Sequence, residues 1–411
     1  MSAYACEPGS GSEPGVGWNW ARQAAAQGHQ VHLVTRSNNR QAIESASDSH
    51  PNNLAIHYLD LPAPFLMAKR RTGYYGLLFY YYAWQMHLGW TARRLHRIHH
   101  FDVAHHVTFV IDWMPSGLSL LRVPFVWGPV GGSTHHLPAG FDLKLPPYAR
   151  RHEKIRSTVQ KICRLVDPFL LLTRSKADAI LVYSKEGLAG IPARHRGKAS
   201  AVIHVGVSDE DLPRGIQPQP LTGGPFLRIA SGGRLVHWKG FDILIEGFAA
   251  FLKAGGKGSL SFSGEGPFRP HLEGLVAQLD VQEHVNFVGY LPTRADVYRH
   301  ISANDVFALP TLRDGPPVAI LEAMLVGRPI LCLDVGATSE MVPPHAGVRV
   351  PVGTRSETAS GIENALTHFA DRPEVLRDMG AAARAHVLEL HNWANVGELI
   401  VRVYESVVDP E

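Results

Sequence analysis

Two cations beside a pair of glycines are the residues best suited to hold a diphosphate. Arg234 and Lys239 follow Gly232 and Gly233 in GGRLVHWKGFDILIEGF, where we predict a helix from about Gly240. Arginine can clamp two phosphate oxygens at once, and lysine supplies a point charge at the helix entrance. Scattered surface cations would leave the same pattern, so the spacing alone leaves both interpretations open.

Two acidic residues flank a second predicted helix start. In DGPPVAILE, Asp314 lies in the loop after DVFALP, and Glu322 lies about one turn inside a helix that begins near Pro317. The free N–H groups of a helix start favour phosphate, and proline suits the first helical position. A glutamate within an apolar helix needs a partner, and ribose or sugar hydroxyls would be such partners.

A glycine run and a histidine pair are the candidates in the first half. Gly15 and Gly17 precede a helix predicted from about Trp18, and glycines there would let the backbone approach a donor. A tight strand-to-helix turn is the alternative, and the match to a dinucleotide fingerprint is weak. His105 and His106 end the predicted strand DVAHHVT, either as core histidines or with one imidazole reaching a ligand. Side chains alternate along a strand, so only one of the two can face that ligand.

These candidates need a framework that gathers them at one edge of a sheet. Short β-branched runs alternate with helical patterns, which is typical of parallel strands with crossover helices. The predicted strands are 31–35, 54–59, 102–108, 124–127, 179–184 and 201–206, followed by 227–233, 259–266, 285–290, 305–310 and 329–334. Ligands gather beyond the carboxyl ends of such strands, where the candidates lie.

A segment rich in proline and glycine interrupts this alternation. We predict an α/β fold with two doubly wound parallel-sheet domains, residues 1–213 on the acceptor side and residues 227–390 for a nucleotide-sugar. Residues 214–226 form the predicted linker. Residues 391–411 are predicted to be a helix that could pack back on the first domain.

The composition excludes several classes of protein. Hydrophobic residues make up 45% and charged residues 19% of the 411, which favours a buried core over disorder. The formal net charge of +3 is far below the excess that nucleic-acid binding needs. Three distant cysteines, Cys6, Cys163 and Cys332, form no metal or redox pair and indicate a reducing cytoplasm. We expect neither a metal nor a bound cofactor.

The segment 69–97 combines aromatic and basic residues. It is too polar for a bilayer core, so we predict a long helix packed in its domain, with contact to a membrane surface or a lipid-linked acceptor as the alternative. The stretch MSAYACEP does not resemble a secretion signal, since it has no basic start followed by an apolar run. We expect the protein in the cytoplasm, free or peripheral at the inner face of the membrane.

Together the motifs resemble those of the retaining glycosyltransferases of family 4, whose GT-B fold places two Rossmann-like domains across a cleft. The resemblance is carried by AYACEPGSGSEPGVGWNWA, FDVAHHVTF, PFVWGPVGG, GRLVHWKGFDILIEGF, FSGEGP, VNFVGYLP and PTLRDGPPVAILEAMLVGRPIL. These stretches occur in the family's order, and the first of them suggests a bacterial branch. Relatives have several apolar residues before AYACEP, so the first strand looks clipped.

The resemblance implies roles for individual residues of the second half. Arg234, Lys239 and Gly233 would hold the diphosphate of a nucleotide-sugar, and Glu322 would bind the ribose hydroxyls. The helix start that would face the phosphates consists of Gly315, Pro316, Pro317 and Val318. Many relatives have Gly-Phe-Gly at the first three of these positions, so this chain offers fewer N–H donors there.

The resemblance also implies contacts to the base and the donor sugar. Tyr290 and Leu291 match the segment that seats the base. Asp314 matches a family glutamate that meets the sugar hydroxyls, and it is one methylene shorter, so donor choice could differ. His105 best matches the family histidine that reaches the donor from the opposite domain, and His106 is the alternative.

The implied activity is transfer of a sugar from a nucleoside-diphosphate sugar to an acceptor hydroxyl. The acceptor would be a natural product, a polysaccharide or a lipid-linked glycan. The nucleoside diphosphate would leave while the acceptor attacks from the same face, with the leaving phosphate as base. The alternatives are a nucleotide-sugar epimerase, a nicotinamide-dependent oxidoreductase that uses the glycine run, and a binding protein without turnover.

Overall fold

The chain divides into two compact units in the computed structural model. The structure describes residues 1–46, 50–131, 137–208, 211–213, 226–313 and 315–409. The first unit is Met1–Thr134, Arg156–His204 and Trp393–Glu411, and the second is His135–Ile155 and Val205–Asn392. The grouping of 135–155 with the second unit was not part of our prediction. Nearly all of the predicted linker lies outside the described residues.

The first unit contains a sheet of seven parallel strands. Their order is β3-β2-β1-β4-β5-β6-β7. The strands are β1 (Ser2–Ala3), β2 (Val31–Thr35), β3 (Leu54–Tyr58), β4 (Ala104–Thr108), β5 (Phe125–Val130), β6 (Ala179–Val182) and β7 (Ala199–Ala201). The strand predicted at 201–206 is wrong by several residues, because pairing with β6 begins at Ala199.

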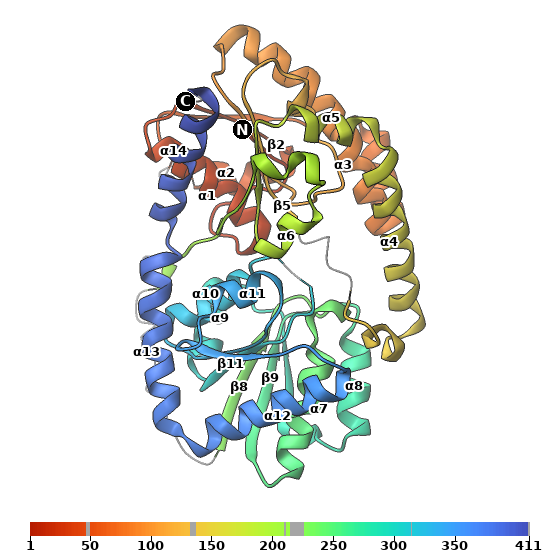
Figure 1. Cartoon of the computed structure of the whole chain (residues 1–411), viewed down its shortest axis with the longest axis vertical. Coiled ribbons are helices and arrows are strands. Elements are labelled where there is room, and N and C mark those ends of the chain that lie inside the picture. Colours follow the sequence, from red (N-terminus) through yellow and green to blue (C-terminus); the bar gives the residue numbers. More distant parts are fainter. Residues whose placement is uncertain (47–49, 132–136, 209–210, 214–225, 314, 410–411) are drawn as a thin grey trace. The chain divides into compact units, whose positions relative to one another are not determined.

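The helices of the first unit come from both the amino-terminal and the carboxyl-terminal parts of the chain. They are α1 (Ser12–Ala26), α2 (Arg40–Ser45), α3 (Ala63–His99), α5 (Pro168–Lys176), α6 (Lys185–Gly190) and α14 (Trp393–Val408). Figure 1 shows α14 beside α1, although they lie at opposite ends of the sequence. Helix α4 (Pro147–Val166) begins in the second unit and ends in the first. No described helix is long and apolar enough to span a bilayer.

The second unit contains six parallel strands in the order β10-β9-β8-β11-β12-β13. The strands are β8 (Phe226–Gly232), β9 (Lys257–Ser263), β10 (Val285–Gly289), β11 (Val306–Leu309), β12 (Ile330–Leu333) and β13 (Gly347–Val350). The helices are α7 (Phe241–Lys253), α8 (Arg269–Gln278), α9 (Arg294–Ser302), α10 (Val318–Leu325), α11 (Gly336–Met341), α12 (Arg355–Asp371) and α13 (Pro373–Leu390). The prediction of a parallel α/β sheet in each half is confirmed, and β13 was missed.

Burial explains why these runs become parallel strands. Strands β4, β5, β11 and β12 are buried along their whole lengths, as strands covered by helices on both faces must be. In the second unit α7 and α12 pack side by side over one face of the sheet (Figure 1). These apolar layers fix the strand ends, and with them the loops that carry the candidate residues.

Candidate functional site

Strands β8 and β11 mark the place in the second sheet where the direction of winding reverses. From β8 the chain moves outward to β9 and β10, and it returns to β11 on the other side of β8. In open parallel sheets this reversal opens a crevice beyond the carboxyl ends of the two strands, where ligands bind. The predicted diphosphate segment follows β8, and the predicted donor-sugar segment follows β11.

Glycines line the strand ends on the β8 side of the reversal. Gly233, Gly264 and Gly289 follow or end three neighbouring strands, with φ of 125°, 115° and 85°. Gly264 N–H donates to Gly289 O at 2.7 Å, and Gly233 N–H donates to Ser263 O at 3.0 Å. A side chain at Gly264 would collide with the Gly233 carbonyl. The result is a ledge of bare backbone, which suits the close approach of a ligand.

Of the three glycines of this ledge, only Gly233 was predicted from the sequence as a site residue. The signal for the other two was present, because SLSFSGEG and VNFVGY both place a glycine at the end of a β-branched or aromatic run. Tyr290, one of the predicted base-binding residues, follows Gly289 directly and is 74% exposed. Leu291 beside it is half-buried.

The two cations predicted to bind phosphate lie ahead of a short turn after β8 and at the end of that turn. Arg234 is exposed and Lys239 is half-buried at the end of the 3-10 turn η7 (His237–Lys239). Gly240 follows with φ of 69°, and a side chain there would collide with the Pro310 carbonyl. Leu312 N–H donates to Trp238 O at 2.9 Å. The turn after β8 and the loop after β11 are therefore joined by direct backbone contacts.

Helix α10 begins where the sequence predicts it. Its N-cap is Pro317, whose side chain makes no capping hydrogen bond, so the helix start at Val318 presents backbone N–H groups. Gly315 and Pro316 ahead of it are half-buried. Asp314, predicted to meet the donor sugar, lies outside the described residues.

Glu322 is buried inside α10, as its apolar surroundings predict. Its Oε1 accepts from Arg294 Nη2 at 3.3 Å, and Arg294 also donates to Asp211 Oδ1 at 2.9 Å and to Tyr298 Oη at 3.0 Å. Burial raises the pKa of Glu322, and the charge of Arg294 opposes that rise. We expected ligand hydroxyls to be the partners of the buried Glu322, but Arg294 already supplies one of its hydrogen bonds. No sequence signal pointed to Arg294, which is far away in the chain.

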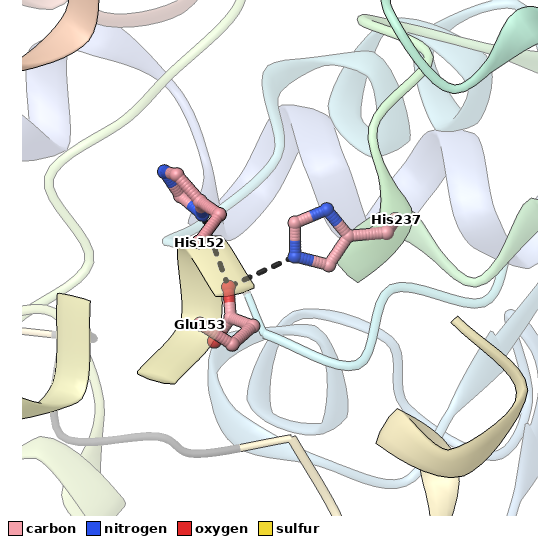
Figure 2. A group of neighbouring side chains, drawn as sticks. All are labelled: His152, Glu153 and His237. Atoms are coloured by element: carbon pink, nitrogen blue, oxygen red, sulfur yellow. Dashed lines mark hydrogen bonds and ion pairs between the residues drawn. The ribbon is translucent and has the colours of Figure 1, made fainter. Parts of the chain in front are cut away.

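A cluster around Glu153 supports the turn that carries Lys239. Glu153, on α4, accepts from His237 Nε2 at 2.9 Å, and His152 Nδ1 lies 3.6 Å from the same oxygen (Figure 2). Arg313 donates to both carboxylate oxygens of Glu153, at 2.5 and 2.9 Å. The Arg313 guanidinium also lies 5.2 Å from the Trp238 ring centre. One carboxylate thus joins α4, η7 and the loop after β11.

The donor atoms of His152, Glu153 and His237 are close enough together to hold a metal ion. Burial alone would raise the pKa of Glu153, but the nearby His152 ring and the hydrogen bonds from His237 and Arg313 hold it well below its usual range. A metal would have to displace the Arg313 guanidinium or share the carboxylate with it. We therefore assign these residues to an ion-pair network.

The first sheet has an equivalent reversal between β1 and β4. Helix α1 follows β1 but begins at Ser12, so the prediction of a start near Trp18 is wrong. Gly15 and Gly17 consequently lie inside α1, both buried. Side chains there would collide with the carbonyl oxygens of Ser10 and Ala5, so packing of the loop on the helix already requires both glycines. Their role beside a donor remains a prediction.

His105 is a buried residue with both ring nitrogens engaged. It is 1% exposed, its Nε2 lies 2.7 Å from Gly128 O, and its Nδ1 lies 2.8 Å from Tyr404 Oη. Burial lowers its pKa to about 3, against the effect of the Gly128 bond. A carbonyl can only accept, so we assign the hydrogen of the neutral ring to Nε2 and a donated bond from Tyr404 to Nδ1. This geometry matches the alternative that His105 is a core histidine, and it leaves neither ring nitrogen free to contact a donor sugar.

His106 is equally buried, and it contacts a different set of residues. Its Nδ1 lies 3.3 Å from Ser2 Oγ, and its Nε2 lies 3.2 Å from Phe109 O and 3.4 Å from Tyr81 Oη. Burial lowers its pKa to about 4. As expected from the alternation of side chains along a strand, the rings of His105 and His106 contact different residues. Which of them meets a donor sugar remains a prediction.

Glu13 was not among the predicted site residues. It lies in the first turn of α1, and its Oε1 accepts from Val110 N–H, just after β4, at 2.6 Å. Burial raises its pKa to about 7, and the Val110 bond opposes that rise. A carboxyl group that titrates near neutrality, at a sheet reversal, is typical of functional sites. The sequence signal was its place in the glycine run.

A cavity of about 390 Å³ lies at the opposite, amino-terminal edge of the first sheet. Its lining includes Val31, Phe101, Val103 and Tyr404. None of the predicted site residues lines it, so we assign it no role in the chemistry.

Comparison with known proteins identifies one family. Residues 227–368, roughly a third of the chain, match the model of glycosyl transferases group 1. A GDP-mannose-dependent monoacylated alpha-(1-6)-phosphatidylinositol monomannoside mannosyltransferase of Corynebacterium glutamicum is 30% identical over 185 residues. That match covers 43% of this chain and 47% of the relative, so the chain spans less than half the length of this curated relative.

Solved structures match over nearly the whole chain. Sucrose-phosphate synthase of Thermosynechococcus elongatus has a TM-score of 0.65 at 19% identity and covers 100% of this chain and 97% of its own. HepE of Anabaena, in complex with UDP-glucose, has a TM-score of 0.56 at 14% identity and covers 98% of each chain. At these identities the likeness establishes the fold. Residues 227–368 therefore match a glycosyl transferases group 1 domain, and the two parallel sheets of the chain are those of the GT-B fold.

Proposed function

We propose that this protein is a retaining glycosyltransferase of family 4, which moves a sugar from a nucleoside-diphosphate sugar to an acceptor hydroxyl. The observation that carries the proposal is the convergence of three features at the β8–β11 reversal. They are the ledge of Gly233, Gly264 and Gly289, the flanking Arg234 and Lys239, and the start of α10, where Pro317 offers no side-chain cap. Each feature suits a diphosphate, and backbone contacts hold the two loops together.

The proposed reaction needs no nucleophile from the protein. The bond between the sugar and the diphosphate breaks, and its electron pair leaves with the nucleoside diphosphate. The acceptor oxygen forms the new bond on the same face of the sugar, and its proton passes to the leaving phosphate. Arg234, Lys239 and the α10 start stabilise the charge that builds on that phosphate, so no metal is required.

The remaining donor contacts are proposed around this centre. Glu322 meets the ribose hydroxyls with the part of its carboxylate that Arg294 does not hold, and Tyr290 and Leu291 lie beside the base. The UDP-glucose complex of HepE and the GDP-mannose dependence of the Corynebacterium relative make uridine and guanosine the first bases to test. That relative's phosphatidylinositol substrate supports a lipid-linked glycan as acceptor. The three cysteines are free, in keeping with a reducing cytoplasm.

The first test is a panel of nucleoside diphosphates measured by thermal unfolding. A ligand present at 100 times its Kd adds about 2.7 kcal/mol to the stability, which shifts the melting temperature measurably. We expect one diphosphate to stabilise the wild-type protein and to stabilise Arg234→Ala much less. Lys253→Ala is the control, because Lys253 is an exposed cation at the far end of α7. Equal shifts in the two variants would remove Arg234 from the site.

Product analysis with the matching nucleotide-sugar separates the proposal from its alternatives. A transferase forms a glycoside with the configuration of the donor retained, and this requires an acceptor. An epimerase would rearrange the sugar without one, and a binding protein would give no product with any acceptor. A glycoside of inverted configuration would contradict the retaining mechanism.

A further inference from the structure

Positive charge is concentrated on three helices of this chain. Within the first unit, α3, residues 156–166 of α4, and α5 contain eleven lysines and arginines and no acidic residue. The whole chain has a formal net charge of only +3, so the rest of the molecule is net acidic. The acidic residue of α4, Glu153, lies in the second unit and is bound there by Arg313.

The exposed face of α3 combines this charge with aromatic side chains. Tyr75, Phe79 and Trp90 are 43%, 60% and 63% exposed, and Arg94 and Arg97 are exposed as well. The spacings of 4, 11, 4 and 3 residues between these five positions place them on one face of a helix. The opposite face, with Tyr81, Trp84 and Leu88, packs into the core, which leaves the aromatic face to the surroundings.

A second apolar group lies where α4 ends and α5 begins. Ile162, Leu165, Val166 and Phe169 are 55%, 76%, 62% and 40% exposed. Four large apolar side chains exposed within eight consecutive residues form a patch that an isolated soluble surface rarely shows. Lys161 lies beside them and is also exposed. We call this group, together with the exposed face of α3, the elbow surface.

Tyr82 connects the two parts of the elbow surface. Its ring lies 6.4 Å from that of Phe169, and its hydroxyl donates to Asp167 Oδ1 at 3.1 Å. Asp167 also caps α5, accepting from the backbone N–H groups of Phe169 and Leu170. Asp167 is therefore half-buried and held by the α5 cap and by Tyr82, and its single negative charge is outnumbered by the cations of these helices.

We propose that the elbow surface docks on a bilayer of anionic phospholipid. The apolar tips of Leu165, Val166, Phe79 and Trp90 enter the interface, and the surrounding cations attract the headgroups. A second copy of the chain is a poor occupant, because it would bring one strongly basic face against another. This proposal goes beyond the transferase reaction and does not depend on it.

The test is sedimentation of the full-length protein with vesicles. One preparation contains phosphatidylcholine alone, and the other adds about a third phosphatidylglycerol to it. We expect binding to the anionic vesicles only, and weaker binding at high salt because the charges are screened. Leu165→Ser together with Val166→Ser is expected to weaken binding about tenfold. Arg94→Gln is expected to weaken it about fivefold, as loss of one cation at a charged surface does.

Matched controls separate docking from general effects on the protein. Leu390→Ser removes an apolar side chain that is 49% exposed from α13 in the second unit, and Lys253→Gln removes an exposed cation there. Both should bind like the wild-type protein. Because all the altered residues are exposed, circular dichroism and the melting temperature should be unchanged in every variant.

Contact with the acyl chains can be measured directly. Vesicles with brominated acyl chains quench tryptophans that enter the membrane, and we expect Trp90→Phe to abolish most of that quenching. No binding to anionic vesicles at low salt would overturn the proposal. So would binding that the Leu165 and Val166 substitutions leave unchanged, or a dimer in sedimentation velocity that the same substitutions dissociate.

Discussion

The two sheets reverse their winding in the same way, but their reversals are built from different groups. In the first unit, between β1 and β4, the histidines are buried and bonded to protein groups, and Glu13 is held by Val110. In the second unit, between β8 and β11, the strand ends present bare backbone, flanked by Arg234 and Lys239. The topology is shared, so the loops after the strands decide which reversal suits an anion.

The contrast extends to charge. Burial keeps His105 and His106 neutral and raises the pKa of Glu13, so the first reversal has little fixed charge near neutral pH. The second reversal has two arginine or lysine cations and a helix start. A doubly charged leaving group is stabilised by the second arrangement and gains nothing from the first. The variants that follow test whether this contrast holds.

The largest expected effect is a loss of stability when the cluster around Glu153, which supports the turn after β8, is disrupted. Glu153→Ala leaves the buried Arg313 without its partner, and loss of one member of a buried pair costs about 3 kcal/mol or more of the free energy of unfolding. Chemical denaturation measures this. Glu273→Ala is the control, because its pair with Arg269 is exposed and should contribute less than about 1 kcal/mol. Equal losses in the two variants would show that Glu153 does not support the turn.

The next effect is on the reaction itself. Lys239→Ala should lower kcat about 100-fold, about 2.7 kcal/mol of the barrier, as loss of one charge-stabilising donor does. The melting temperature should change little, because Lys239 ends a turn that backbone bonds hold in place. Steady-state kinetics with the matching nucleotide-sugar measures the loss, and Lys253→Ala again serves as control. Near-normal turnover would place the leaving phosphate elsewhere.

The first reversal should respond to pH. Burial raises the pKa of Glu13 from about 4.5 to about 7, so the folded state disfavours the ionised carboxylate. The wild-type protein is then most stable, with respect to this group, below pH 4.5, and it loses that stability as the pH rises to about 7. Glu13→Gln cannot ionise and keeps an acceptor for Val110.

The free energy of unfolding of Glu13→Gln, relative to that of the wild-type protein, should therefore rise between pH 4.5 and 7. The shift in the pKa of Glu13 sets an upper limit of about 3 kcal/mol for this rise. We expect about 2 kcal/mol, because the side chain is partly exposed. Unfolding free energies across this range measure the difference, which should be constant above pH 7.5. A difference that does not change with pH would mean that Glu13 titrates at its ordinary value.

The strands and helices that form both reversals could largely be predicted from the sequence, because they depend on local patterns of residues. Most strands and the start of α10 follow from β-branched runs and proline placement, and the candidates at the carboxyl ends of β8 and β11 follow from the parallel topology. The start of α1 was placed too late, because glycines normally disfavour a helix, whereas here close packing of the loop requires them.

The contacts that complete the sites could not be predicted in this way. Arg294 meets Glu322 and Arg313 meets Glu153 across long stretches of chain, and neither partner is marked by a local pattern. The burial of His105 against Tyr404 joins β4 to the last helix of the chain. Such pairings depend on which faces of distant elements meet, and a single sequence contains no signal for that.

The smallest effect tests His105 itself. Tyr404→Phe removes the hydroxyl that donates to Nδ1 and leaves the ring and its packing, so it should cost about 1 kcal/mol of unfolding free energy. If His105 is a core histidine, kcat and KM for the donor should stay at wild-type values, because the freed nitrogen remains buried. If His105 reaches the donor, a change in its hydrogen bonding should alter turnover more than stability. Measuring both quantities on this one variant therefore decides whether the first reversal contributes a histidine to the reaction or only a framework.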